Sequence, residues 1–386
     1  MSDLGTAIDP TGPASDGVAP SLDPSSGWRL ALRPLALFLA SRLGVFMVVA
    51  ATANILKQRV SDGLVLWDSK WYLMIASSGY VRHIPPGSGN PAQSDLGFFP
   101  LLPIFVRLVH NVTTLGFSSS AFIAVFLLGA GASVAVWWMI HDLWGVRAAD
   151  RGTAFVVFSP GAFVLSYVYS EAATILFVAL CLLALRRRRW ILAGLAAGVA
   201  SAADPVAVAV VVPCIVGAYV AIRDHRELRA LWAPILAPAG LLAFFTYLWV
   251  HTGSPLEWFK AQRAGWQGGT YFGSVPRAFG HLFAHGFEDP NYAVKAICIV
   301  AVIAILVVFF RARPPATWIG YVVAVLALGI ISPVIGVTPR LLLRDFPLLA
   351  VLGARLNGLW FEIIFGLFAV SMAALTVISN GPFWTP

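Results

Sequence analysis

The sequence has 386 residues, of which 59% are hydrophobic and 11% charged, and its mean hydropathy is +0.81. So few charged side chains cannot cover the surface of a water-soluble protein of this size, so a soluble globular fold is excluded. The formal net charge of +8 comes from Lys and Arg residues in short stretches between apolar runs, a membrane-topology pattern that argues against nucleic-acid binding. We therefore expect an all-α polytopic membrane protein.

The N-terminal stretch has a different composition from the rest of the chain. Residues 1–27 are rich in Pro, Gly, Ser and Asp and contain no Lys or Arg, which predicts a disordered tail. No basic stretch precedes the first apolar run as in a signal peptide, so we expect that run to remain as a span. Residues 28–386 are expected to form a single transmembrane domain.

Eleven apolar stretches approach the length of about 20 helical residues that crosses a hydrocarbon core. They lie at roughly 31–53, 119–141, 152–167, 168–185, 190–203, 205–222, 231–251, 292–310, 317–334, 341–355 and 358–378. Two of them are short, and each is followed by a polar break, at 167–171 and at 201–205. Helix breaks at membrane depth are tolerated where they line a cavity or are buried in protein.

Basic residues mark alternate connections between these spans. Arg29 and Arg33 precede the first span, and later connections carry Arg147, Arg151, Arg186 to Arg189, Arg223, Arg226, Arg229, Arg311, Arg313 and Arg355. All of them fall on one side of the membrane if the N-terminus is cytoplasmic, as the positive-inside rule requires. We expect a multi-pass protein of the cell membrane whose tail, residues 1–27, is cytoplasmic.

The same alternation keeps residues 64–116 on the outer side, because another crossing there would invert every later connection. This first outer loop is expected to carry two interfacial helices, near 68–78 and 100–110, separated by 85–89. Residues 252–290 form a second outer loop, which begins with an amphipathic pattern. From it, Lys260 and Gln262 are candidates to contact a substrate, although a helix lying in the interface explains the same pattern.

Asp68 is the leading candidate for a catalytic residue. It lies between Trp67 and Trp71, with Tyr72 next to them. A carboxylate can take the proton of an acceptor hydroxyl as a glycosidic bond breaks, and the flanking rings offer stacking faces for a sugar. The alternative is structural, with Asp68 capping an interfacial helix and the aromatic residues forming a membrane belt.

Glu171 is a second ionisable residue in an apolar setting. It follows Tyr169 at the first helix break, and a charged group inside a hydrophobic stretch is a functional candidate by default. It could orient an acceptor, pair with an arginine or, together with Asp68, bind a divalent metal. The alternative is an N-cap at the break. The His residues show no metal-binding spacing, so the sequence itself predicts no metal site.

Arg340 and Arg344 are spaced four residues apart, so they share one face of a helix that Pro339 opens. Two guanidinium groups on one face can hold a phosphate, which makes both arginines candidate substrate-binding residues. The alternative is an ion pair from Arg344 to Asp345 or to Glu171. Cys181, Cys214 and Cys298 lie within apolar runs and are expected to be small core residues.

Several of these residues belong to blocks that occur in a recognisable order. The blocks are Trp67-Asp68-x-x-x-Tyr72-x-x-Ile75-Ala76-x-x-Gly79-Tyr80, Phe98-Phe99-Pro100-Leu101-Leu102-Pro103, Ser159-Pro160-x-x-Phe163, Tyr169-Ser170-Glu171, Gly253-x-Pro255-Leu256 with Ala261-Gln262, and Pro339-Arg340-x-x-Leu343-Arg344-x-Phe346-Pro347. Together they cover roughly residues 30–350. In this order they resemble the second mannosyltransferase of GPI-anchor assembly and its bacterial relatives.

The resemblance implies a GT-C-type glycosyltransferase, here a bundle of about eleven transmembrane helices. Such enzymes take a sugar from a polyprenyl-phosphate donor and transfer it with inversion on the outer side. Their catalytic acid lies in the first outer loop, which corresponds to Asp68. One position departs from the family pattern: Asp204 precedes Pro205 where family members tend to carry Arg.

The alanine-rich and arginine-rich composition suggests a high-GC, for instance actinobacterial, host that makes no GPI anchor. The expected reaction is then transfer of mannose from polyprenyl-phosphate mannose to a glycolipid, glycan or protein of the cell envelope, beside membrane lipids. The alternative function is a lipid or glycolipid transporter, or flippase, which would also show broken helices and basic outer patches.

Overall fold

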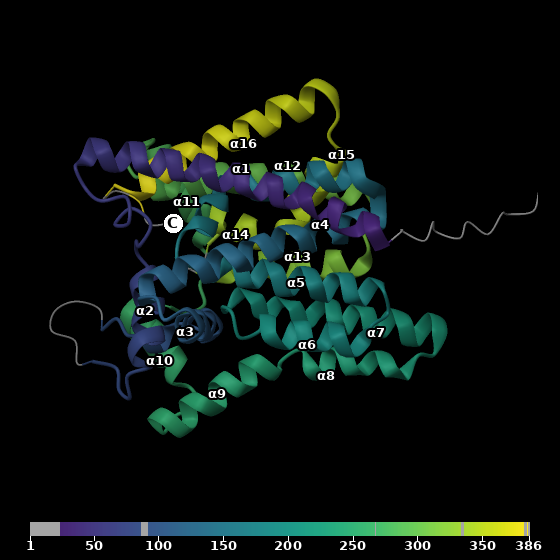
Figure 1. Ribbon diagram of the computed structural model, residues 1–386, viewed down its shortest axis with the longest axis horizontal. Coiled ribbons are helices and arrows are strands. Elements are labelled where there is room, and N and C mark those ends of the chain that lie inside the picture. Colours follow the sequence, from purple (N-terminus) through teal and green to yellow (C-terminus); the bar gives the residue numbers. More distant parts are fainter. Residues whose placement is uncertain (1–23, 86–91, 267, 333–335, 382–383, 385–386) are drawn as a thin grey trace, which may run out of the picture.

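The computed structural model describes residues 24–85, 92–266, 268–332, 336–381 and 384, and side chains from Arg29 onward. The expected tail, 1–27, therefore lies almost wholly outside the described residues. Within the described residues the secondary structure is entirely helical (Figure 1). The all-α class expected from composition is confirmed.

Helices of the first half are α1 Pro24–Leu56, α2 Ser69–Ser78, η1 Asp95–Gly97, α3 Leu101–Thr113, α4 Phe117–Val157, η2 Pro160–Ser166, α5 Glu171–Arg186 and α6 Trp190–Ala200. Those of the second half are η3 Val206–Val210, α7 Val211–His225, η4 Leu228–Leu231, α8 Trp232–Leu236, α9 Ala239–Thr252, α10 Glu257–Trp266, α11 Ser274–His285, α12 Pro290–Arg311, α13 Ala316–Ile331, α14 Pro339–Arg344, α15 Phe346–Arg355 and α16 Gly358–Ser379. The elements named η are short 3-10 helices.

Among the described residues, six helices are long and apolar enough to cross a membrane, and a bent pair makes up to seven. The bent pair is η2 with α5, which meet at 108°. Helices α3, α6, α13 and α15 are apolar but shorter. The multi-pass character is therefore confirmed, whereas the expected number of eleven spans is not.

Helix α4 joins two of the expected spans into one element of 41 residues. Gly145 interrupts it with φ of 77° and ψ of −176°, a conformation that glycine adopts at no steric cost. The chain turns back here, since Trp137 Nε1 donates to Asp150 Oδ1 at 2.8 Å across the turn. The later of these two expected spans, 152–167, is an α-helix only to Val157 and is followed by η2.

Both expected polar breaks are present, and a third was not expected. Helix α5 begins at Glu171 after the first break, and η3 begins at Val206 after the second. The third break falls at Asp345, inside the expected span 341–355, and separates α14 from α15. Pro347 explains it, because proline lacks the backbone N–H for a helix hydrogen bond and its ring would collide with the carbonyl of Leu343 if the helix continued.

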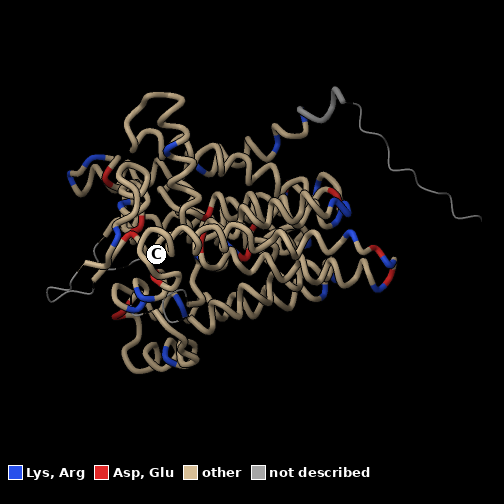
Figure 2. The backbone as a smooth tube through the Cα atoms, turned by 90° about the horizontal axis from the view of Figure 1, so that it is seen from below, with Lys and Arg blue, Asp and Glu red and all other residues tan. Residues whose placement is uncertain are grey.

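The basic connections meet at one end of the bundle, as expected. Arg33 pairs with Asp150, Arg187 with Asp142 at 2.7 Å, and Arg188 with Glu227 at 2.5 Å. At the same end Arg355 donates to the carbonyl of Ala312 at 3.1 Å. Figure 2 shows many of the charged residues gathered at the two ends of the bundle, and a smaller number between them.

The opposite end carries α2, α3 and α10 (Figure 1). Helices α2 and α3 confirm the two helices expected in the first outer loop, and most of the stretch expected between them lies outside the described residues. Arg107 joins them by donating from Nε to the carbonyl of Ala76 at 2.8 Å. The second outer loop likewise forms helices, α10 and α11.

Arg42 is a buried cation within the first span, α1. Its Nη1 donates to the carbonyl of Ala162 and to Ser166 Oγ, both at 2.8 Å, and its Nη2 donates to the carbonyl of Val157 at 3.1 Å. These acceptors belong to the end of α4 and to η2, where the regular helix hydrogen bonds are interrupted. Arg42 therefore satisfies backbone carbonyls at a break that water does not reach.

We predict that Arg42→Met lowers the free energy of unfolding by on the order of 2 kcal/mol, because it leaves buried carbonyl groups without donors. Unfolding of the purified protein in mixed micelles measures the change. Arg59→Met is the matched control, since Arg59 is exposed and pairs only with Asp62 at 3.4 Å. Equal stability of the two variants would contradict this role of Arg42.

Candidate active site

Asp68 is the residue immediately before α2, but its side chain does not cap that helix. Instead its Oδ2 accepts from Arg340 Nη1 at 2.7 Å. The capping alternative is therefore wrong for the side chain. The two residues are 272 positions apart in the sequence, so the contact is set by the fold and joins the first outer loop to α14.

Glu171 is fully buried at the first turn of α5. Its Oε1 accepts from Arg340 Nε and from Arg344 Nη2, the latter at 2.9 Å. The N-cap alternative for Glu171 is wrong, because Ser170 occupies that position and the carboxylate faces the two arginines. The alternative of an ion pair between Arg344 and Glu171 is correct.

The two arginines lie on one face of α14, which begins at Pro339 as expected. Thr338 fixes this start, because its hydroxyl accepts from the backbone N–H of Leu341 at 3.2 Å. The guanidinium of Arg340 also lies over the ring of Tyr169, 4.4 Å from its centre. Arg340 is thus held by two carboxylates and an aromatic face.

Asp204, the residue that departs from the family pattern, forms the other end of this network. Its Oδ1 accepts from the backbone N–H groups of Val206 and Ala207, at 2.7 and 3.0 Å. Its Oδ2 accepts from Thr174 Oγ1 at 2.8 Å and lies 3.3 Å from Arg344 Nε. Ser170 Oγ donates to the same Oδ2 at 3.4 Å. Four hydrogen bonds and the ion pair with Arg344 therefore compensate the charge of Asp204, so it restrains Arg344 instead of adding an unbalanced anion.

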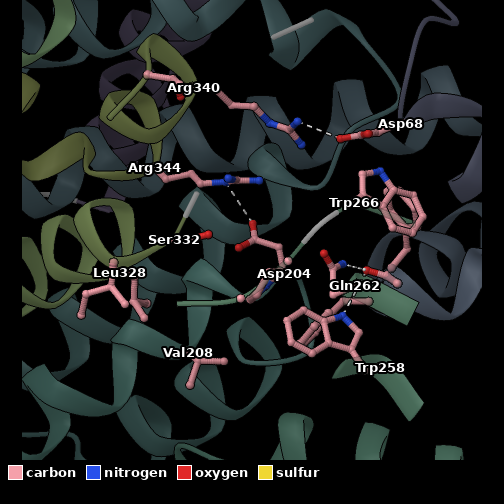
Figure 3. Close-up of a pocket in the computed structure, with 18 of the residues that line it drawn as sticks. Asp68, Asp204, Val208, Trp258, Gln262, Trp266, Leu328, Ser332, Arg340 and Arg344 are labelled. Carbon is pink, nitrogen blue, oxygen red and sulfur yellow. Dashed lines mark hydrogen bonds and ion pairs between the residues drawn. The ribbon is translucent and has the colours of Figure 1, made fainter. Parts of the chain in front are cut away.

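A cavity of about 680 Å³ opens beside this network (Figure 3). It is lined by Asp68, Tyr72, Gly97, Phe98, Phe99, Asp204, Pro205, Val208, Leu241, Phe245, Trp258, Phe259, Gln262, Arg263, Trp266, Gly268, Gly269, Thr270, Asn291, Val294, Lys295, Leu328, Ile331, Ser332, Thr338, Arg340, Arg344 and Trp384. Figure 3 shows Arg340 reaching toward Asp68 and Arg344 toward Asp204, with Trp258, Gln262 and Trp266 along another side. Asp68 and Arg340 both line the cavity, whereas Glu171 lies outside its lining and contacts the two arginines.

The aromatic residues around Asp68 have different positions. Tyr72 lines the cavity and donates to Ser170 Oγ at 3.1 Å. Burial, followed by the charge of Asp68, raises the pKa of the Tyr72 phenol, so it remains a neutral donor. Trp67 and Trp71 do not line the cavity: Trp67 donates to the carbonyl of Ser379 at 3.2 Å, and Trp71 stacks on Phe98.

Helix α10 forms one side of the cavity and is held there by two hydrogen bonds to one carbonyl group. Gln262 Nε2 and Trp258 Nε1 both donate to the carbonyl of Gly97, at 2.8 and 3.1 Å. Gln262 therefore lines the cavity as expected. Lys260 does not, because it points to the exposed side of α10 and pairs with Glu257 at 2.9 Å.

Asn291 of α12 and Trp266 of α10 line the cavity and were not predicted. Arg263 of α10 and Lys295 of α12 line it as well. Lys295 is an ionisable residue near the start of an apolar span, a position that is typical of functional residues. Trp384 also lines the cavity, but it lies beyond the last span and no motif around it predicts a role in the site.

The donors around the network do not fit a metal ion. Among the described residues, no three His, Cys, Asp or Glu side chains are close enough together to hold one. The guanidinium of Arg340 bridges Asp68 and Glu171, the two carboxylates suggested as ligands. The three cysteines are buried and free, as expected, although Cys181 and Cys214 place their sulfur atoms 3.6 Å apart.

No protein-family model matches this sequence, and no curated protein matches it. The chain is similar to the crystal structure of ArnT from Cupriavidus metallidurans bound to undecaprenyl phosphate, with a TM-score of 0.53 and 17% identity over 91% of this chain and 64% of ArnT. For ArnT in the apo state the TM-score is 0.51, at 17% identity over 92% of this chain and 64% of ArnT.

The chain thus spans just under two thirds of the length of the ArnT structures that it resembles. At 17% identity the likeness concerns the fold alone. It confirms the expected GT-C-like bundle of membrane helices.

The charge network makes a prediction about stability. Glu171→Gln should lower the free energy of unfolding by about 3–5 kcal/mol, because it leaves two buried guanidinium groups with too few carboxylates. Combining it with Arg344→Gln should cost less than the sum of the single changes, which a double-mutant cycle measures.

The control cycle uses Arg188 and Glu227, a more exposed pair at the other end of the bundle. Its coupling energy should stay below about 1 kcal/mol. Additive effects of Glu171→Gln and Arg344→Gln would show that the buried pair is not a coupled unit.

Proposed function

We propose that this chain is a membrane-embedded glycosyltransferase that uses a polyprenyl-phosphate sugar donor. The observation that carries the proposal is the carboxylate of Asp68, which faces the cavity beside the paired Arg340 and Arg344. A carboxylate and several cations at one cavity provide the two functions that sugar transfer from a phosphate requires. These are a proton acceptor and a site for the departing phosphate.

In the proposed reaction, a hydroxyl group of the acceptor attacks the anomeric carbon of the donor sugar. Asp68 takes the proton of that hydroxyl group. The bond between the anomeric carbon and the phosphate oxygen breaks at the same time, and the polyprenyl phosphate leaves with the electron pair. Attack opposite to the leaving group inverts the anomeric configuration.

The departing phosphate would be bound by the cations that line the cavity. Arg340 and Arg344 are held in place by their carboxylate partners, which keeps their geometry fixed before a ligand arrives. Lys295 makes no ion pair with any residue in the described part of the chain, so its ammonium group is available to a phosphate. ArnT, whose fold is similar, has been crystallised with undecaprenyl phosphate, which supports a lipid phosphate as the ligand class.

The finer assignment is mannose as the sugar and an envelope glycolipid, glycan or protein as the acceptor. It rests on the resemblance of the sequence blocks around Asp68, Glu171 and Arg340 to the second GPI mannosyltransferase. Tyr72, Trp258 and Trp266 supply aromatic rings along the cavity on which a sugar could stack. The proposed location of the cavity is the extracytoplasmic side, opposite the basic connections.

The alternative, a lipid or glycolipid transporter, is less well supported by the cavity. A transporter needs a path that reaches both faces of the membrane in turn. Among the described residues, those that line the cavity belong to the end that carries α2 and α10, and none belongs to the basic connections at the other end.

We predict that Asp68→Asn lowers sugar transfer from polyprenyl-phosphate mannose by at least about 10³-fold, since the amide cannot accept the proton. Transfer is measured with the purified protein, radiolabelled donor and membrane lipid extract. Asp62→Asn is the matched control, because Asp62 lies in the same connection between α1 and α2 with its side chain about half exposed. Full activity of Asp68→Asn would rule out this catalytic role.

A second pair of variants tests the phosphate site. Lys295→Met should raise KM for the donor about tenfold with a smaller effect on kcat, as expected for a lost charge-assisted contact in the ground state. Lys260→Met should leave both constants unchanged, because Lys260 lies outside the cavity. The reverse result would place the phosphate on the exposed face of α10.

A further inference from the structure

Helix α11 exposes large aromatic side chains that the proposed reaction does not use. Phe283 lies on the exposed side of α11 and is 85% exposed. Phe272 and Phe287 flank the two ends of the helix and are 71% and 74% exposed. Three phenyl rings this exposed in one short segment form an apolar surface that water would not favour.

The other side of α11 is already packed against the protein. Ala278 is fully buried, and Phe279 and Leu282 pack against the main hydrophobic core. His281 stacks on Tyr292 of α12, with ring centres 4.2 Å apart. The exposed phenyl rings therefore lie on the side of α11 opposite its packed side. They are not core residues that lack a packing partner.

Helices α12 and α13 determine the level at which α11 lies. Helix α12 has 22 residues and is about 33 Å long, so it just crosses a hydrocarbon core of about 30 Å. Its C-terminal residue, Arg311, belongs to the basic end, so its N-terminal residue, Pro290, lies near the opposite boundary of the bilayer. Phe287 precedes Pro290 by three residues. At the other end of the segment, Tyr271 donates its backbone N–H to the carbonyl of Ile331, the last residue of α13, at 2.8 Å.

We propose that α11 lies in the membrane interface, with the rings of Phe272, Phe283 and Phe287 inserted among the lipid acyl chains. Lipid is favoured over a soluble protein as the partner because α11 packs against α12, a membrane span whose own exposed side is apolar, with Ile297 and Val300 each 57% exposed. Exposed Arg277 and His285 are placed to contact headgroups, as in interfacial amphipathic helices.

This placement has a consequence for the cavity. Thr270, just before α11, and Asn291, just after it, both line the cavity. An inserted α11 would therefore hold the cavity opening at the depth of lipid headgroups, where the phosphate of a lipid-borne donor lies. The consequence rests on the proposed function, whereas insertion of α11 does not.

The test measures the depth of single spin labels in the full-length protein in phosphatidylcholine and phosphatidylglycerol vesicles. The three natural cysteines are buried, so labels go on Phe283→Cys and Phe287→Cys, with the unmutated protein as the labelling blank. Ile303→Cys, on the exposed side of α12, is the lipid reference, and Arg59→Cys is the aqueous reference. Collision rates with oxygen and with a water-soluble nickel complex report the depth.

The collision rates of labels at 283 and 287 are expected to be close to those of the lipid reference. Both labels should collide more often with oxygen and less often with the nickel complex than the label at position 59. A rate of collision with the nickel complex equal to that at position 59 would overturn the proposal. It would indicate that the phenyl surface faces water and binds a soluble protein instead. Because the readout does not involve sugar transfer, a failure of insertion and a failure of the proposed function are distinguishable.

Discussion

The alternation of carboxylates and guanidinium groups from Asp68 through Arg340, Glu171 and Arg344 to Asp204 is the interaction on which the site depends. Charges removed from water in a membrane protein must be paired, because an uncompensated buried ion costs several kcal/mol. The pairing also draws together segments that lie far apart in the sequence. The same contacts that stabilise the charges therefore build one wall of the cavity.

Contacts elsewhere in the fold hold the start of α5 and the start of α14 next to each other. Arg42 donates hydrogen bonds to η2, which ends shortly before Glu171. In this way η2 sets the direction in which α5 starts. Gly161 of η2 lies against the backbone of Pro339, where a larger side chain would collide, so η2 also supports the start of α14. One short 3-10 helix thus positions both Glu171 and Arg340 from the side away from the cavity.

The sequence predicted the class, both polar breaks and the helix start at Pro339, because these depend on local composition and on proline. Asp68, Glu171 and the two arginines were candidates from the sequence because charged side chains are rare in apolar surroundings. The partners of those charges, the supporting role of Asp204 and the positions of Trp67, Trp71 and Lys260 depend on contacts between distant segments. Such contacts leave no trace in local spacing, which is also why Trp384 was missed.

The proposed function requires that the protein transfer a sugar from a lipid phosphate with inversion of the anomeric configuration. The most direct measurement is nuclear magnetic resonance of the product formed by the purified protein from a polyprenyl-phosphate sugar of known anomeric configuration. We expect a product of opposite configuration, together with one released polyprenyl phosphate for each sugar transferred. A product of retained configuration would contradict this expectation, as would movement of the lipid across the bilayer with its sugar still attached.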